Sequence, residues 1–140
     1  MSRTAGKTTE KASEKLRSAG LRPTRQRVAL AGLLFARGHR HMTAESLHAE
    51  AANAGIGVSL ATVYNTLHQF TEAGLLRQVA VDANRYYFDT NTGPHQHFYN
   101  EAEGALIDIP GDSIAIAGVP APPDGMEVER VDVVVRIRRG

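Results

Sequence analysis

The sequence contains no cysteine and no tryptophan. Without cysteine there are no disulfide bonds and no thiolate metal sites, which excludes a structural zinc site made of four cysteines. Long apolar runs are also missing. The longest, residues 28–36, has nine residues, whereas a membrane-spanning helix needs about 20. The first twenty residues are polar and charged, unlike a signal peptide. We therefore expect a cytoplasmic protein with no membrane partner.

What is present suits a small globular protein. A length of 140 residues with 42% hydrophobic residues allows one ordinary domain or two small ones. The net charge of +1 is unevenly distributed. Residues 1–89 carry 12 Lys/Arg and 7 Asp/Glu, a formal charge of +5, and residues 90–140 carry 4 and 8, a formal charge of −4. A basic front half joined to an acidic back half favours a polyanion-binding module fused to a second module, although a solvated basic tail has the same composition.

Four helices are expected before residue 75. A disordered arm, residues 1–9, precedes the first, from about Glu10 to Ala19. The next three are expected at residues 25–36, 44–53 and 60–73. Each of these three follows a serine or threonine that can cap its first turn, and glycines follow their ends.

The fourth expected helix has two contrasting faces. One carries an apolar stripe at helical spacing: Leu60, Val63, Leu67 and Phe70. The other carries small or polar residues and no acid: Ala61, Thr62, Tyr64, Asn65 and His68. A helix face that serves only solubility would normally include Glu and Lys. The second face is therefore a candidate for contact with nucleic acid.

Two strand-like runs follow, L-L-R-Q-V-A-V and R-Y-Y-F-D, around a turn at residues 82–84. Short helices followed by a hairpin are the order of a winged helix, in which one helix enters the major groove of DNA. A helical domain with an incidental hairpin is the alternative. We assign residues 1–89 to a winged-helix DNA-binding domain with a basic N-terminal arm.

The T-N-T-G-P segment, residues 90–94, is turn-rich and is expected to be a hinge. Residues 95–140 read as a small β-rich domain whose last strand alternates apolar and other residues, with Val131, Val133, Val135 and Ile137 on one face. A three-stranded sheet of this size is marginal alone, so we expect a second copy to complete it in a homodimer.

His95 and His97 lie two residues apart in an expected strand, so both imidazoles point to the same face. Asp89, Asp108 and His41 are further donors near this pair. Three imidazoles and two carboxylates suit Fe²⁺, Mn²⁺ or Zn²⁺. The plainer alternative is a pair of half-exposed strand histidines.

Metal-dependent oxygenases also use an H-x-H pair with a carboxylate. Here no histidine follows His97, and nucleophile motifs and glycine-rich phosphate loops are absent. The second domain is too small to enclose a substrate. We therefore expect no enzyme, with an H-x-H metal-dependent enzyme as the remote alternative.

Several motifs together resemble the ferric uptake regulator family: G-L-R-P-T-R-Q-R (20–27), H-M-T-A-E-S-L (41–47), V-S-L-A-T-V-Y-N-T-L (58–67), G-L-L (74–76) and H-Q-H-F-Y-N (95–100). Their order and spacing match from about Leu16 to Asp108. The resemblance implies an α+β protein, with a winged-helix domain followed by a small α/β dimerisation domain containing an antiparallel sheet. It also implies a homodimer that binds double-stranded DNA at AT-rich inverted repeats and regulates transcription.

The resemblance also assigns residues. It places Ser59, Thr62, Tyr64 and the adjoining Asn65 on the recognition helix, and it matches Arg22 to a basic residue that reaches the minor groove. It matches one set of residues to the family's regulatory metal site: His41, Asp89, His95, His97 and Asp108. In this set Asp89 replaces the more usual glutamate.

The sequence also departs from the common family pattern. Asn100 and Glu103 stand where a Cys-x-x-Cys often holds structural zinc, and Asn65 stands where arginine is common. The Y-N-T-L and H-x-H-F-Y-N segments and the C-terminal R-V-D-V-V-V-R-I-R-R are similar to the iron response regulator branch. That branch implies a role in iron homeostasis and a response to haem, with His95 and His97 as the candidate haem ligands. A manganese- or peroxide-responsive regulator of the same family is the alternative.

Overall fold

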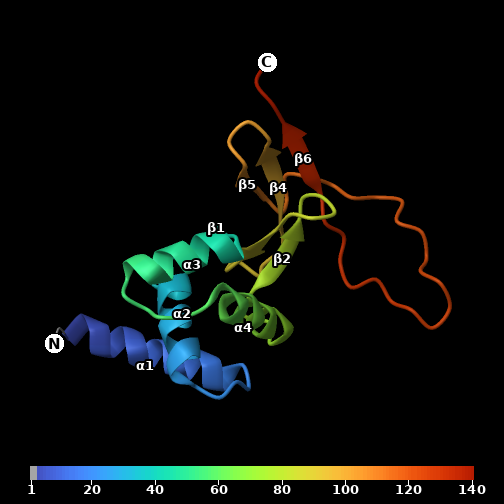
Figure 1. The fold of residues 1–140 in the computed structure, drawn as a ribbon. Coiled ribbons are helices and arrows are strands. Elements are labelled where there is room, and N and C mark those ends of the chain that lie inside the picture. Colours follow the sequence, from blue (N-terminus) through green and yellow to red (C-terminus); the bar gives the residue numbers. More distant parts are fainter. Residues whose placement is uncertain (1–2) are drawn as a thin grey trace. The chain divides into compact units, whose positions relative to one another are not determined.

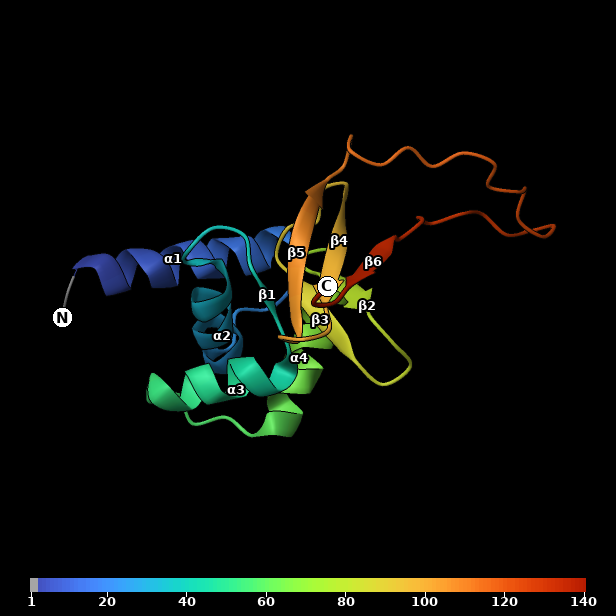
Figure 2. The same cartoon turned by 90° about the horizontal axis from the view of Figure 1, so that it is seen from above.

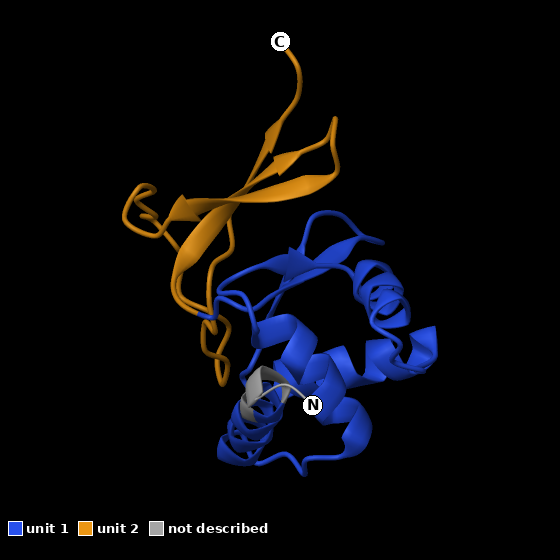
Figure 3. Ribbon diagram, turned by 90° about the vertical axis from the view of Figure 1, so that its left-hand side faces the viewer, with its two compact units in different colours: residues 1–92 blue, residues 93–140 orange. Residues whose placement is uncertain are grey.

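The protein is described by a computed structural model for residues 3–140, with the side chains of residues 3–5 and 7 excepted. Its elements, labelled in Figure 1 except for β3, which is labelled in Figure 2, are α1 Arg3–Ser18, α2 Arg25–Phe35, β1 His41–Met42, α3 Ala44–Asn53, α4 Leu60–Glu72, β2 Arg77–Ala80, β3 Tyr86–Asp89, β4 His95–Asn100, β5 Ala105–Pro110 and β6 Val134–Ile137. The chain forms two compact units, residues 1–92 and 93–140 (Figure 3). None of the helices within residues 3–140 is long and apolar enough to cross a membrane.

The first unit is a winged helix, as the sequence predicts. Its four helices precede an antiparallel hairpin of β2 and β3, and β1 joins the other edge of β3 to give the order β1-β3-β2. One core unites all four helices with the sheet. Its fully buried members include Leu16, Leu30, Leu34, Leu47, Val63, Leu67, Phe70 and Phe88. The predicted stripe of α4 is thus the buried face, apart from the half-buried Leu60.

The starts of the helices follow their capping residues. Thr24, Thr43 and Ser59 each accept a hydrogen bond from a backbone N–H of the first turn, which satisfies one of the donors that a helix start leaves unpaired. Thr43 and Ser46 form a reciprocal capping box. Gly74, with φ of 82°, follows α4 in the left-handed conformation that glycine adopts without strain.

Two expectations for the first unit are wrong. Residues 3–9 belong to α1 and do not form a disordered arm, because a helix whose later turns are buried through Ala12 and Leu16 extends at little cost. Residues 1–2 of the expected arm lie outside the described residues. His41 and Met42 form strand β1 instead of a loop, because the free edge of β3 pairs with them.

The second unit is a three-stranded sheet in the order β5-β4-β6. The β4–β5 pair is antiparallel, as expected, but β6 runs parallel to β4. Parallel neighbours need a long crossover, and residues 111–133 supply it as an extended link that leaves the sheet and returns (Figure 2). Residues 93–140, all described, contain no helix, so the α part of the expected α/β domain is missing here. The last strand begins at Val134, and Val131 is exposed.

Candidate functional site

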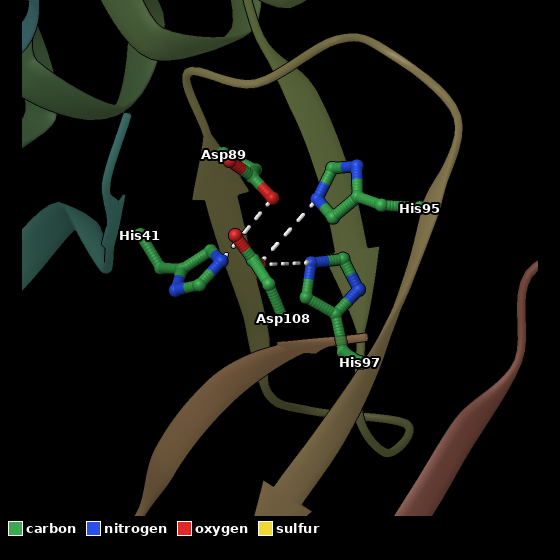
Figure 4. A group of neighbouring side chains, drawn as sticks. All are labelled: His41, Asp89, His95, His97 and Asp108. Carbon is green, nitrogen blue, oxygen red and sulfur yellow. Dashed lines mark ion pairs between the residues drawn. The ribbon is translucent and has the colours of Figure 1, made fainter. Parts of the chain in front are cut away.

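In the first unit, β1 and β3 bring His41 and Asp89 together. The two residues are direct partners in the antiparallel register, and His41 Nε2 lies 3.3 Å from Asp89 Oδ2 (Figure 4). The backbone N–H of Asn91 donates to the other carboxylate oxygen at 2.8 Å. Asp89 is completely buried. Burying an ionised carboxylate costs free energy unless cations or hydrogen-bond donors surround it. The position of Asp89 therefore favours a cationic or hydrogen-bonding partner.

In the second unit, the alternation of β4 places His95 and His97 on one face, as the H-x-H spacing predicts. Their ring centroids are 4.5 Å apart, and both residues are buried, at 5% and 1% exposure. Asp108 on β5 is the register partner of His97. Its Oδ1 lies 3.6 Å from His95 Nε2 and 3.5 Å from His97 Nε2 (Figure 4). The plainer expectation of half-exposed histidines does not describe this pair.

One contact fixes how His95 presents its ring. Nδ1 lies 2.7 Å from the carbonyl oxygen of Gly93. A carbonyl only accepts, so Nδ1 carries the hydrogen, and Nε2, which faces Asp108, is the nitrogen that can coordinate a metal ion. Metal-binding histidines are commonly oriented by such a second hydrogen bond. The donors in each unit are imidazole and carboxylate groups, which suit Fe²⁺, Mn²⁺ and Zn²⁺. If the imidazoles are protonated, their contacts with Asp89 and Asp108 are ion pairs and need no metal ion.

The residues expected to contact DNA lie at the start of α4 and before α2. Ser59 Oγ accepts from the backbone N–H of Thr62 at 3.1 Å and donates to Thr62 Oγ1 at 2.9 Å, so these two hydroxyls are engaged with each other. Asn65 and Arg22 are exposed. His68 instead packs against the wing, with its ring centroid 5.6 Å from that of Phe88.

Tyr64 makes a contact that the sequence did not predict. Its hydroxyl donates to Glu45 Oε1 at 2.5 Å, across the space between α4 and the first turn of α3. This hydrogen bond lowers the pKa of Glu45 and raises that of Tyr64. The two residues are nineteen positions apart, and no local pattern links them. The first two turns of α4 carry no acid but border one from α3, and the exposed acid of α4 itself is Glu72 at its last residue.

The ferric uptake regulator family matches residues 18–134 of the chain. The ferric uptake regulation protein of Pseudomonas aeruginosa is 36% identical over 98 residues, which are 69% of this chain and 73% of that protein. The peroxide-responsive repressor PerR of Staphylococcus aureus is 32% identical over 100 residues, covering 71% and 67%. A solved structure of the Pseudomonas aeruginosa ferric uptake regulator with manganese aligns with a TM-score of 0.69 and 29% identity, covering 91% of this chain and 97% of that one. The chain therefore belongs to the ferric uptake regulator family, whose members are transcriptional regulators and not enzymes.

Proposed function

We propose that the protein is a homodimeric regulator of iron homeostasis whose affinity for operator DNA is set by one divalent metal ion. The observation that carries this proposal is that each unit contains a histidine–aspartate group: His41 with Asp89 in the first, and His95 and His97 with Asp108 in the second.

The two groups together fit one ion better than either does alone. The first offers two side-chain donors and the second offers three, whereas the candidate ions take about four to six ligands. Only residues 90–94 separate Asp89 from His95 in the chain. A segment of that length spans at most about 20 Å, so the chain tethers the groups closely. A bound ion would neutralise the carboxylates and hold the two units at one mutual angle.

DNA binding is supported by the fold and the charge of the first unit. The exposed residues of α4 are the uncharged Ala61, Asn65 and Gln69, followed by a single acid, Glu72, at the end of the helix. Arg27 donates from Nε and Nη2 to Gln69 Oε1, at 3.3 and 3.0 Å, and so lies beside the same helix. Residues 1–89 carry the formal charge of +5. These features favour double-stranded DNA as the partner, with α4 in the major groove. AT-rich inverted repeats as the bound sequence rest on the family resemblance.

Dimerisation is supported by apolar exposure in the second unit. Six large hydrophobic residues are conspicuously exposed in the described chain, and all belong to this unit: Ile107, Ile116, Val119, Met126, Val128 and Val131. Strands β5 and β6 are both sheet edges with residues available for pairing. A second copy would cover this surface.

The metal ion and the signal to which the protein responds are proposed from its relatives. Manganese is present in the structure of the Pseudomonas aeruginosa relative, and the Staphylococcus aureus relative is named as peroxide-responsive. A peroxide-responsive regulator is therefore the second candidate. It predicts that hydrogen peroxide releases DNA from the iron-loaded protein but not from the manganese-loaded protein.

A haem response rests on the similarity of the Y-N-T-L and H-x-H-F-Y-N segments to the iron response regulator branch. His95 and His97 are nearly inaccessible, so haem could reach either imidazole only if the strands around them open. Haem and a small ion would then favour different states of the hinge and have opposite effects on DNA affinity.

Calorimetric titration with Mn²⁺ tests whether one ion uses both groups. We expect one ion per chain, with an affinity at least tenfold lower in both His41→Ala and His97→Ala. His39→Ala is the matched control, because His39 is exposed and lies outside both groups. If His97→Ala loses the ion and His41→Ala binds it as tightly as the wild type, the shared site is refuted.

A further inference from the structure

The Tyr64–Glu45 contact lies on the surface that the proposed function presents to DNA. Tyr64 projects from α4, and Glu45 stands in the first turn of α3. A cleft of about 270 Å³ borders both residues and continues along residues 84–88 of the wing. The hydrogen bond joins two residues that line this cleft, so it restrains the tyrosine ring.

The direction of the hydrogen bond is fixed by chemistry. An ionised carboxylate only accepts, so the Tyr64 hydroxyl is the donor. The lowered pKa of Glu45 keeps its carboxylate ionised at neutral pH. The single hydroxyl hydrogen of Tyr64 is therefore already donated to Glu45. What remains for a ligand is the lone pairs of the oxygen and the apolar edge of the ring.

We propose that Glu45 is a positioning residue that sets the base preference of Tyr64 by holding its ring and engaging its hydroxyl hydrogen. This inference rests on the proposed function, in which Tyr64 contacts base edges. Held in this way, Tyr64 accepts from an exocyclic amino group, N6 of adenine or N4 of cytosine, or packs against the methyl group of thymine. It cannot donate to O6 or N7 of guanine.

Two other roles for Glu45 make different predictions. The carboxylate can accept directly from cytosine N4, in which case its effect does not need the Tyr64 hydroxyl. It can also act only as a negative charge near phosphates, in which case removing it tightens binding to every duplex alike. A mutant cycle separates these roles from positioning.

The experiment compares the full-length wild-type protein, Glu45→Ala, Tyr64→Phe and the double variant, in the presence of Mn²⁺. Glu72→Ala is the charge control, because Glu72 is also exposed in the first unit and does not contact Tyr64. An operator is first selected with the wild-type protein from a pool of randomised inverted-repeat duplexes. Affinities are then measured for duplexes with each base substituted in the half-site.

We expect Glu45→Ala to change the preference at one half-site position by about fivefold or more, the lower range for a base contact, with more tolerance of guanine. In the Tyr64→Phe background, the same substitution should leave the preference unchanged and alter affinity uniformly, as Glu72→Ala does. An unchanged preference in Glu45→Ala would overturn the inference. So would an equal change with and without the Tyr64 hydroxyl, which would assign the base contact to Glu45 itself.

Failure of this inference is distinguishable from failure of the proposed function. If Tyr64→Phe and Tyr64→Ala both bind the selected operator as the wild type does, Tyr64 does not contact DNA and the recognition surface is wrong. If Tyr64→Ala weakens binding while Glu45→Ala keeps the wild-type preference, the recognition surface stands and only the positioning role falls.

Discussion

The hydrogen bond between Tyr64 and Glu45 depends on pH and can therefore be detected in the absence of DNA. Because the hydrogen bond from Tyr64 needs its proton, the raised pKa of Tyr64 means that the contact is present below the usual tyrosine range and is lost as pH rises through the raised value. The lowered pKa of Glu45 means that the contact is lost at the acidic end only as pH falls through that depressed value.

Ultraviolet titration of tyrosine ionisation measures this directly. The chain has four tyrosines and no tryptophan to obscure them. We expect one tyrosine to ionise at lower pH in Glu45→Ala than in the wild type, while Glu72→Ala keeps the wild-type curve. Superimposable curves for Glu45→Ala and the wild type would show that the contact does not persist in solution.

The residues proposed to contact DNA should differ in which property of binding their removal changes. Tyr64→Ala should cost about 1–3 kcal/mol of binding free energy and relax base preference, because it removes a base contact. Arg22→Ala should weaken binding with less change in base preference and lower the slope of log affinity against log salt by about 1, because it removes a positive charge from the proposed DNA interface. Binding measured from low to high salt with a fixed duplex set checks both. Wild-type preference and affinity in Tyr64→Ala would contradict the assignment of α4 as the recognition helix.

At the scale of elements, Ser59 caps α4 and is also one of the residues proposed to lie near DNA. Ser59→Ala should lower the free energy of unfolding by about 1 kcal/mol, because the first turn of α4 loses an acceptor. Ser59→Asp should keep that stability, since aspartate also caps, and should weaken DNA binding through its charge. Thermal unfolding and DNA affinity measured together separate the effects. If Ser59→Asp is as unstable as Ser59→Ala, capping is not the role of this side chain.

The elements also show where sequence patterns succeed. The starts of α2, α3 and α4 were predictable, because capping residues and apolar spacing are local signals. Strand β1 was not, because its two residues become a strand only by pairing with β3, far along the chain. That pairing is what sets His41 opposite Asp89. The sequence predicts both residues as metal ligands, but it does not predict that they lie opposite each other in the sheet.

At the scale of the whole molecule, the exposed apolar residues of the second unit make oligomeric state the informative property. Light scattering should give a dimer at micromolar concentration. Removing residues 126–140, which deletes β6, should give monomers or aggregates, because β4 loses its parallel partner. Ile107→Lys should weaken the dimer, since Ile107 is 46% exposed on β5. A stable, well-folded wild-type monomer would contradict the proposed assembly.

The architecture of this second unit was the part least accessible from sequence. The alternation of apolar residues near the C-terminus predicted a strand, but alternation is the same in parallel and antiparallel sheets. The direction of β6 depends on the path of residues 111–133, whose Pro/Gly-rich composition predicts only a link. The His95–His97 pair was predictable, because the two-residue period of a strand fixes which side chains share a face.

The central claim is that a divalent ion on the histidine–aspartate groups controls DNA affinity. The most direct measurement is fluorescence anisotropy of a labelled operator, selected as above, titrated with chelator-treated protein with and without Mn²⁺. The wild type and His39→Ala should change affinity at least tenfold on addition of the ion, and His97→Ala should not respond. Identical wild-type affinities with and without Mn²⁺, Fe²⁺ or Zn²⁺ would contradict the claim.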